Sequence, residues 1–347
     1  MLHKSSGVLT LHQYMQLQEN ISLRPYNTFG IDVAAASFLE ITDISDLEGI
    51  EADTKKLIIG GGSNLLLTKP VDALVLHNKL KGITVEKEND THIWLRVAAG
   101  EIWHDLVLYV VNKGWGGIEN LALIPGTVGA APIQNIGAYG TEIRETIDSV
   151  TFWYWNEKKL LSFSNRECEF GYRDSIFKNQ MRDKFFITSV VLKLDKVPKL
   201  NTSYGAIEQE LAHMGVTEPT VKAVAYAVIH IRTDKLPNPA QIGNAGSFFK
   251  NPSLPKASFE KLLAMYPKIP FYPVNDAWIK VPAAWLIEHC GWKGYRNGDV
   301  GVHAKQALVL VNYGHAHGQE IWDLSGKIVQ SVHERFGIQL EREVQVW

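Results

Sequence analysis

The residues of this sequence that could do chemistry begin with a long glycine-rich stretch, Leu121 to Gly140. It is rich in Gly, Ala and Pro and lacks charged side chains, so it suits neither a stable helix, nor a central strand, nor an ordinary exposed loop. Glycine lets backbone come close to a bound group, and the N–H groups of such a loop can converge on an anion, usually a phosphate. The stretch is therefore either the wall of a cofactor site or a buried connector, and composition leaves both open.

A second glycine-rich segment, Gly60-Gly61-Gly62-Ser63-Asn64, directly follows the apolar residues Leu57–Ile59, which predict a strand. Backbone amides often meet phosphates where a strand leads into such a turn. The dinucleotide fingerprint G-x-G-x-x-G fails, however, because Leu65 stands where the third glycine should be and no long helical pattern follows. A Rossmann site is excluded, and the segment is either a tight turn or a phosphate loop of another fold.

An arginine-containing loop is predicted between two strands, over Cys168–Ser175. Arg173 could hold a carboxylate or phosphate with two parallel hydrogen bonds. The alternative is a surface loop in which Arg173 pairs with Asp174.

The segment Asn244–Pro252 offers a hydroxyl, a cation and an amide on Ser247, Lys250 and Asn251, and Gly246 would let backbone approach closely. The alternative is the end of a strand with an incidental serine. His315 and His317 form an H-x-H pair, but no third metal ligand is near in sequence, so we expect loop histidines and no metal site.

Periodicity and breaker residues predict the elements that must position these segments. Strands are expected at 57–59, 71–77, 83–88, 93–98, 149–155, 159–163, 185–194, 307–311 and 338–347. Helices are expected at 101–112, 219–232, 259–266, 282–290 and 319–336. Residues 1–20 are interpreted as a weakly amphipathic tail or short helix, and the polar residues Arg232–Pro237 as a domain boundary.

Composition excludes several classes of protein. With 347 residues, 46% hydrophobic and 21% charged, the chain is long enough for two or three globular domains. A net charge of −2 gives no field for nucleic acid or anionic membranes, and no apolar run is long enough to span a bilayer. Two cysteines, Cys168 and Cys290, give no disulfide framework, so we expect a cytoplasmic protein.

Five motifs occur in order along the chain: Asn27–Gly30, Gly60–Asn64, Ile124–Gly126 with Gln134–Gly140, Phe170–Ser175 and Gly246–Pro252. Together they closely resemble the UDP-N-acetylenolpyruvoylglucosamine reductase family (MurB), flavoenzymes of peptidoglycan synthesis. Ser203-Tyr204-Gly205 and the residues around them resemble the tyrosine loop of the type I branch.

The resemblance implies an α+β fold, with an FAD-binding fold of the vanillyl-alcohol-oxidase (PCMH) type in two subdomains and a C-terminal α/β substrate domain. The expected boundaries are 1–76 for the first FAD-binding subdomain, 77–234 for the second, and 235–337 for the substrate domain. The strand at 338–347 is expected to return to the first subdomain.

The resemblance also implies a reaction. FAD is bound tightly but not covalently, and NADPH is the cosubstrate that reduces it. Hydride then passes from flavin N5 to C3 of the enolpyruvyl group of a UDP-sugar, C2 is protonated, and UDP-N-acetylmuramate forms. No nucleic acid or membrane partner is expected, and the chain is expected to be a monomer.

Site residues follow from the positions that match the family motifs. Arg173 and Glu343 are expected to stabilise charge on the substrate carboxylate, and Ser247 to protonate C2. Tyr204, Lys235 and Asn251 are expected to bind the substrate. The expected FAD contacts are Gly60, Gly61, Gly62, Ser63, Asn64, Pro125, Gly126, Gly129, Ala130, Ile133, Gln134, Asn135, Gly137, Ala138 and Tyr139.

Two other functions are compatible with these motifs. One is a flavin oxidase that uses the same fold on another substrate. The other is a nucleotide-sugar binding module that has kept the fold and lost the chemistry. Ser247 with Tyr204 and Glu343 argues against the oxidase. Arg173, Ser247 and Glu343 together argue against the binding module.

Overall fold

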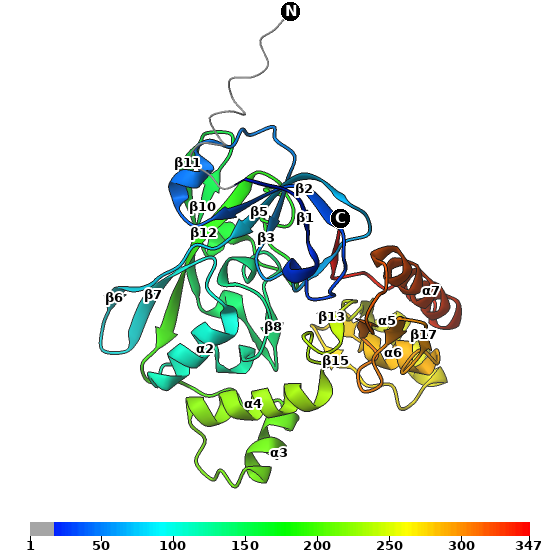
Figure 1. Cartoon of the computed structure of the whole chain (residues 1–347). Coiled ribbons are helices and arrows are strands. Elements are labelled where there is room, and N and C mark those ends of the chain that lie inside the picture. Colours follow the sequence, from blue (N-terminus) through cyan, green and yellow to red (C-terminus); the bar gives the residue numbers. More distant parts are fainter. Residues whose placement is uncertain (1–16) are drawn as a thin grey trace, which may run out of the picture. The chain divides into compact units, whose positions relative to one another are not determined.

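The computed structural model describes residues 17–347, so most of the segment interpreted as a tail or short helix lies outside the described residues. The described chain divides into two compact units (Figure 1). The first holds the residues up to Ile21, Ala34–Gly61 and Val71–Asp234, and the second holds Ser22–Val33, Gly62–Pro70 and Lys235–Trp347. The expected three-domain division stays a prediction.

The first unit contains a four-stranded sheet in the order β1-β2-β5-β3. Its strands are β1 (Gln18–Ser22), β2 (Ala34–Ile41), β3 (Lys56–Ile59) and β5 (Val71–Asn78). Both β2 and β3 pair in parallel with β5. Phe38 and Val75 pair in register across β2 and β5, and both are fully buried in this sheet.

A five-stranded antiparallel sheet, in the order β11-β10-β12-β7-β6, forms the larger core of this unit. Its strands are β6 (Ile83–Glu88), β7 (His92–Ala98), β10 (Ile147–Tyr154), β11 (Lys159–Ser164) and β12 (Phe185–Asp195). Ile93, Leu95 and Val97 are buried on one face of β7, which confirms the alternation seen in the sequence. The strands predicted at 149–155 and 159–163 are also confirmed, and as β10 and β11 they pair from Ser149–Ser164 to Tyr154–Lys159.

Among the described residues, the helices that accompany these sheets are α2 (Trp103–Asn112), α3 (Gly205–His213) and α4 (Val221–Lys235). The helix predicted at 219–232 corresponds to α4. Its predicted end at Arg232 is wrong, because α4 continues to Lys235. Leu236 and Pro237 end it instead, since proline cannot continue a helix and disfavours helical backbone before it. No helix was predicted for α3, which buries only Ile207 and Leu211 and so carries a weak periodic signal.

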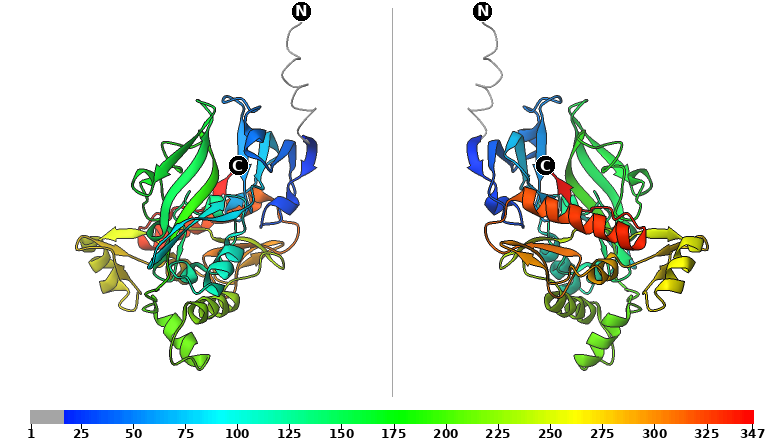
Figure 2. Two further views of the ribbon diagram at one scale, coloured as in Figure 1. Left: turned by 90° about the vertical axis from the view of Figure 1, so that its left-hand side faces the viewer. Right: turned by 90° about the vertical axis from the view of Figure 1, so that its right-hand side faces the viewer.

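The second unit is built on the sheet β13-β19-β18-β17 and a small sheet β14-β16-β15. The strands are β13 (Gly243–Ser247), β14 (Ser253–Pro255), β15 (Tyr272–Pro273), β16 (Trp278–Lys280), β17 (Arg296–Asn297), β18 (Val300–Val302) and β19 (Val309–Asn312). The helices are α5 (Lys256–Met265), α6 (Ala283–His289) and α7 (Gly318–Phe336). Helix α7, orange to red in Figure 2, ends at Gly337 with a φ of +67°, as the sequence predicts.

The predicted strand over 338–347 is largely wrong. Only β20 (Gln345–Val346) is a strand, and it pairs in parallel with β4 (Leu65–Leu66). Before it, Arg342 forms a single bridge with Phe249. The segment is bonded first to one neighbour and then to another, so no continuous ladder forms.

Both cysteines are free, and burial raises the pKa of the Cys168 thiol to about 12, which makes it unreactive. Within residues 17–347, no helix combines the length and apolar character that crossing a membrane demands.

Candidate functional site

The two glycine-rich segments meet inside the first unit. A Cβ added to Gly60 would lie 2.2 Å from Thr127 Oγ1, and one added to Gly61 would lie 2.9 Å from the Cα of Gly126. Neither position has room for a side chain. The turn after β3 and the loop before η4 (Val128–Ala130) therefore approach one another backbone to backbone.

The stretch from Leu121 to Gly140 is neither helix nor central strand, as predicted. It holds the 3-10 turn η4 and the two-residue strand β8 (Gly137–Ala138), which pairs with β9 (Thr141–Glu142). Leu123, Asn135 and Tyr139 adopt positive φ values of 57°, 44° and 48°, which non-glycine residues rarely do. Such backbone persists only where surrounding contacts fix it, and it gathers at functional sites.

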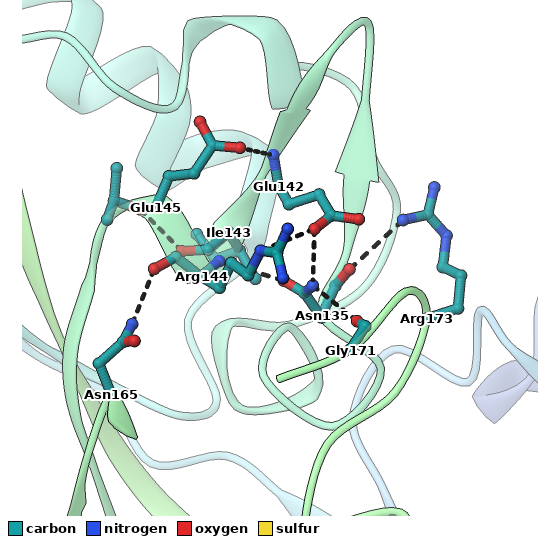
Figure 3. A network of polar contacts seen from close by, with 9 residues as sticks. Asn135, Glu142, Ile143, Arg144, Glu145, Asn165, Gly171 and Arg173 are labelled. Carbon is teal, nitrogen blue, oxygen red and sulfur yellow. Dashed lines mark hydrogen bonds and ion pairs between the residues drawn. The ribbon is translucent and has the colours of Figure 1, made fainter. Parts of the chain in front are cut away.

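Asn135 supplies many of these fixing contacts (Figure 3). It is fully buried, and its Nδ2 donates to Glu142 Oε2 at 3.1 Å and to the Gly171 carbonyl at 2.9 Å. Its Oδ1 accepts from the Arg144 amide at 3.1 Å. The side chain thus ties the glycine-rich stretch to the Phe170–Ser175 loop.

Arg173 is brought against the same stretch. Its guanidinium donates to the carbonyls of Asn135 and Gly137, and a Cβ on Gly137 would lie 2.8 Å from Arg173 Nη1. Arg173 itself has a φ of +54° and is half-buried. Asp174 bonds instead to the Ser175 amide and to Asn179, so the alternative of an Arg173–Asp174 surface pair is wrong.

Two polar residues beside this stretch, Arg232 and His104, were not predicted from the sequence as site residues. Arg232 hydrogen-bonds Tyr139, whose pKa is raised by burial although the guanidinium opposes the rise. Arg232 Nε is buried without a partner among the residues of the described chain. His104 Nδ1 accepts from the Leu123 amide at 3.0 Å, and burial lowers the pKa of this imidazole.

A sequence signal for Arg232 exists. It lies four residues after Val228, which is fully buried on α4, so an arginine continues the apolar face of this helix. The predicted substrate ligand Tyr204 is the exposed N-cap of α3 and contacts the Tyr139 ring edge-on at 5.3 Å.

In the second unit, Gly62 also has no room for a side chain. It has a φ of +58°, and a Cβ there would lie 2.0 Å from the Tyr26 carbonyl oxygen. Its own carbonyl accepts from the Thr28 amide at 3.1 Å. The Asn27–Gly30 motif therefore packs against the end of the glycine turn.

The second unit also brings Glu343 next to two of the motifs. The Glu343 amide donates to the carbonyl of Phe248, the residue after Ser247, at 2.8 Å. Asn64 Nδ2 donates to the Glu343 carbonyl at 3.3 Å, and the Asn64 carbonyl accepts from Gln345. Ser247 ends β13 with an exposed side chain, just after Gly246, whose φ is +69°.

The remaining predicted residues have defined surroundings. Lys250 pairs with Glu341 at 2.5 Å, so its charge is already balanced within the unit. Asn251 Oδ1 accepts from the Ala283 amide at 2.9 Å and so caps α6. Lys235 is exposed at the start of the unit. Across residues 17–347, no group of three or more His, Cys, Asp or Glu side chains could hold a metal ion.

Comparison with known proteins gives this arrangement its context. A family model described as UDP-N-acetylenolpyruvoylglucosamine reductase, C-terminal domain, matches residues 238–347, and one described as FAD binding domain matches residues 50–159. The UDP-N-acetylenolpyruvoylglucosamine reductase of Flavobacterium johnsoniae is 52% identical over 336 residues, covering 96% of this chain and 100% of that protein. This chain belongs to the UDP-N-acetylenolpyruvoylglucosamine reductase family.

Other members of the UDP-N-acetylenolpyruvoylglucosamine reductase family are also similar to this chain in sequence or in structure. The protein of that name from Amoebophilus asiaticus is 48% identical, covering 96% of this chain and 99% of its own. The crystal structure of the MurB reductase from Thermus caldophilus superimposes with a TM-score of 0.69 at 24% identity, covering 96% of this chain and 100% of that one. The predicted family and α+β FAD-binding fold are confirmed.

Proposed function

We propose that this chain reduces UDP-N-acetyl-3-O-(1-carboxyvinyl)-glucosamine to UDP-N-acetylmuramate, using FAD and NADPH, in the synthesis of peptidoglycan precursors. It is then a UDP-N-acetylmuramate dehydrogenase. The observation that carries this proposal is the 52% identity with a reductase of that family over the full length of the relative. The FAD binding domain matched at residues 50–159 supports the cofactor.

The residues present fit FAD. Gly60 and Gly61 pack against Gly126 and Thr127 with no room for a Cβ, which leaves bare backbone at the meeting point. Backbone N–H groups presented in this way suit a pyrophosphate, and the binding needs no covalent bond. We assign the FAD contacts to this turn, to the Leu121–Gly140 stretch and to Gly62–Asn64.

FAD bound here would supply hydride, obtained from NADPH, for addition to C3 of the enolpyruvyl group. Adding hydride to C3 pushes negative charge onto the substrate carboxylate, so the reaction is helped by a cation or an acidic hydrogen aimed there. We assign this task to Arg173 and Glu343. Arg173 is held by two backbone carbonyls, which limits its freedom to reorient.

The second new C–H bond needs a proton at C2, and we assign Ser247 to donate it. A serine hydroxyl is a weak acid, so it works only when held against the carbon in the transition state. Gly246, with its φ of +69°, directs the end of β13 and thereby the Ser247 side chain. Neighbouring Lys250 is neutralised by Glu341 and is therefore a weaker source of positive potential than a lone lysine.

Binding of the UDP-sugar is assigned to Tyr204, and to Lys235 and Asn251 of a substrate domain spanning 235–337. Lys235 and Tyr204 are exposed, as groups that meet a diphosphate must be. We further propose that the chain is a monomer that works in the cytoplasm without nucleic acid partners. Its two free cysteines suit a reducing compartment.

The test is a pair of half-reactions followed by absorbance. The purified protein should carry flavin absorbance, bleach when NADPH is added without air, and recover its colour when the enolpyruvyl UDP-sugar is added, with UDP-N-acetylmuramate found by mass spectrometry. Absence of flavin binding after FAD is added would contradict the proposal. Fast recovery of colour with O₂ and none with the sugar would favour an oxidase instead.

A further inference from the structure

Helix α7 contacts Arg342, the residue before Glu343, through two side chains. Arg342 Nε donates to Ser325 Oγ at 2.8 Å, and the Arg342 guanidinium lies 4.0 Å from the centroid of the Trp322 ring. Ser325 is fully buried and donates to the Trp322 carbonyl at 2.6 Å, so its oxygen is fixed in direction. A charged donor on a fixed oxygen and a cation over an indole are both among the stronger side-chain contacts.

The segment that contains Arg342 is hydrogen-bonded on its other side to residues 248–250, which follow Ser247. The Lys250 amide donates to the Glu341 carbonyl at 2.9 Å, and the Glu343 amide donates to the Phe248 carbonyl at 2.8 Å. Between these two bonds, Arg342 bridges Phe249. Both ends of the tripeptide 341–343 are thus tied to backbone, which fixes its position along the segment 248–250.

Side chains of an extended segment alternate between its two faces. Glu341 projects to the face where it meets Lys250 at 2.5 Å, and Arg342 projects to the face covered by α7. Glu343 therefore projects to the same face as Glu341, away from α7. A rotation of the segment about its own axis would swing Glu343 off this face. It would have to pull Arg342 from Trp322 and Ser325 as well as break the two backbone hydrogen bonds.

We propose that Arg342 is a positioning residue, which through Trp322 and Ser325 of α7 holds the Glu343 carboxyl in its working direction. This inference rests on the proposed function, in which Glu343 supports the second half-reaction. It assigns a catalytic consequence to an arginine that faces away from the reacting groups. It also gives α7 a role beyond covering the sheet of the second unit.

Three variants separate this role from a general loss of stability. Arg342→Met keeps an apolar stem over Trp322 and removes the charge and the donor. Arg342→Lys keeps a charge near the indole and removes the fork. Arg296→Met is the matched control, because Arg296 also lies over an aromatic ring, 3.9 Å from the Tyr313 centroid, and also donates through Nε, to the Gly298 carbonyl at 2.9 Å, in the same unit.

In the half-reactions, Arg342→Met should leave bleaching by NADPH unchanged and slow the return of colour with the enolpyruvyl sugar by about 10- to 100-fold. Arg342→Lys should lie between this variant and wild type, and Arg296→Met should match wild type. Wild-type rates in both half-reactions for Arg342→Met would overturn the proposal. So would an equal loss in both half-reactions, because that is what a purely structural role predicts.

A second readout needs neither FAD nor substrate. In the apoprotein, Arg342→Met should speed hydrogen exchange of the Glu343 amide by on the order of tenfold, and Arg296→Met should not. Unchanged protection of that amide would overturn the positioning role. A wild-type protein that binds no flavin or ignores the sugar would contradict the proposed function instead, and the exchange experiment would still decide the role of Arg342.

Discussion

Replacing Gly61 by alanine is the sharpest test of the backbone contact in the first unit. The new Cβ would lie 2.9 Å from the Cα of Gly126, whereas ordinary van der Waals contact begins at 3.4 Å. The obstacle is backbone, so no side-chain rotation relieves it. The glycine turn and the Leu121–Gly140 stretch must separate by about 0.5 Å, and the contacts across them weaken steeply over such a gap.

The expected cost is that of overpacking a close contact, about 1–3 kcal/mol in the free energy of unfolding of the apoprotein. If the same backbone holds FAD, separating the two segments should also weaken the binding of FAD. At about 1.4 kcal/mol per factor of ten, the same range corresponds to an FAD dissociation constant raised about 5- to 150-fold. Urea unfolding followed by circular dichroism measures the first quantity, and a flavin fluorescence titration measures the second.

Gly60→Ala offers a companion with a built-in rescue. Its Cβ would meet Thr127 Oγ1 at 2.2 Å, but the Thr127 Cβ stands back at 3.3 Å. Adding Thr127→Ala removes the hydroxyl and should restore most of the lost stability, whereas the same change should not rescue Gly61→Ala. Gly205→Ala is the control, because a Cβ there has nothing within 4 Å.

A Gly61→Ala protein that unfolded at the wild-type urea concentration and bound FAD with wild-type affinity would refute both the close contact and its assignment to FAD. A Gly61→Ala protein of wild-type stability with weakened FAD binding would support the assignment of this turn to FAD and contradict the close contact. A destabilised variant with normal FAD affinity would keep the contact and contradict the assignment of this turn to FAD.

Three further predictions follow from single residues. Ser247→Ala should leave bleaching by NADPH intact and slow the substrate-driven recovery of flavin colour by about 10²- to 10⁴-fold. A recovery rate equal to that of the wild type would exclude Ser247 as the proton donor. Asn135→Ala removes buried hydrogen bonds and should cost about 1–3 kcal/mol in urea unfolding, whereas the exposed Asn156→Ala should cost little. Because burial lowers the pKa of His104 from 6.5, the unfolded chain binds the proton more readily, so stability should fall as the pH drops from about 7 to about 5. His104→Gln, which keeps an acceptor for the Leu123 amide, should flatten that fall in urea unfolding.

Local patterns in the sequence were sufficient for much of the fold. Alternation over Ile93–Ala98 predicts a strand because a half-buried sheet repeats every two residues, and the structure places β7 there. The periodic stretch before Gly337 predicts α7 because an amphipathic helix needs a residue with positive φ to end it. The glycines at 60–62 and 126 indicated backbone that comes close to another group. An added Cβ would meet a neighbour at each of Gly60, Gly61 and Gly62, and Gly126 has a φ of +118°.

Contacts between distant segments were beyond such patterns. Asn135 reads in the sequence as one member of a cofactor motif, yet its side chain holds Gly171 and Glu142. Arg232 reads as part of a polar break, yet it extends the buried face of α4 and bonds Tyr139. In each case the residue type was visible, but its partner was set by the tertiary fold.

The C-terminal segment shows why this limit matters for the chemistry. Alternation over 338–347 suggested a strand that would deliver Glu343 as part of a regular ladder. The structure instead ties Glu343 to Phe248 and Asn64 one bond at a time, and the preceding residue, Arg342, packs against α7. A short, irregular attachment of this kind can turn about its axis, whereas a strand within a sheet cannot. The carboxyl assigned to catalysis therefore depends on a helix that no motif of the family includes, so substitutions in α7 at Trp322 or Ser325 should alter the second half-reaction before they alter flavin binding.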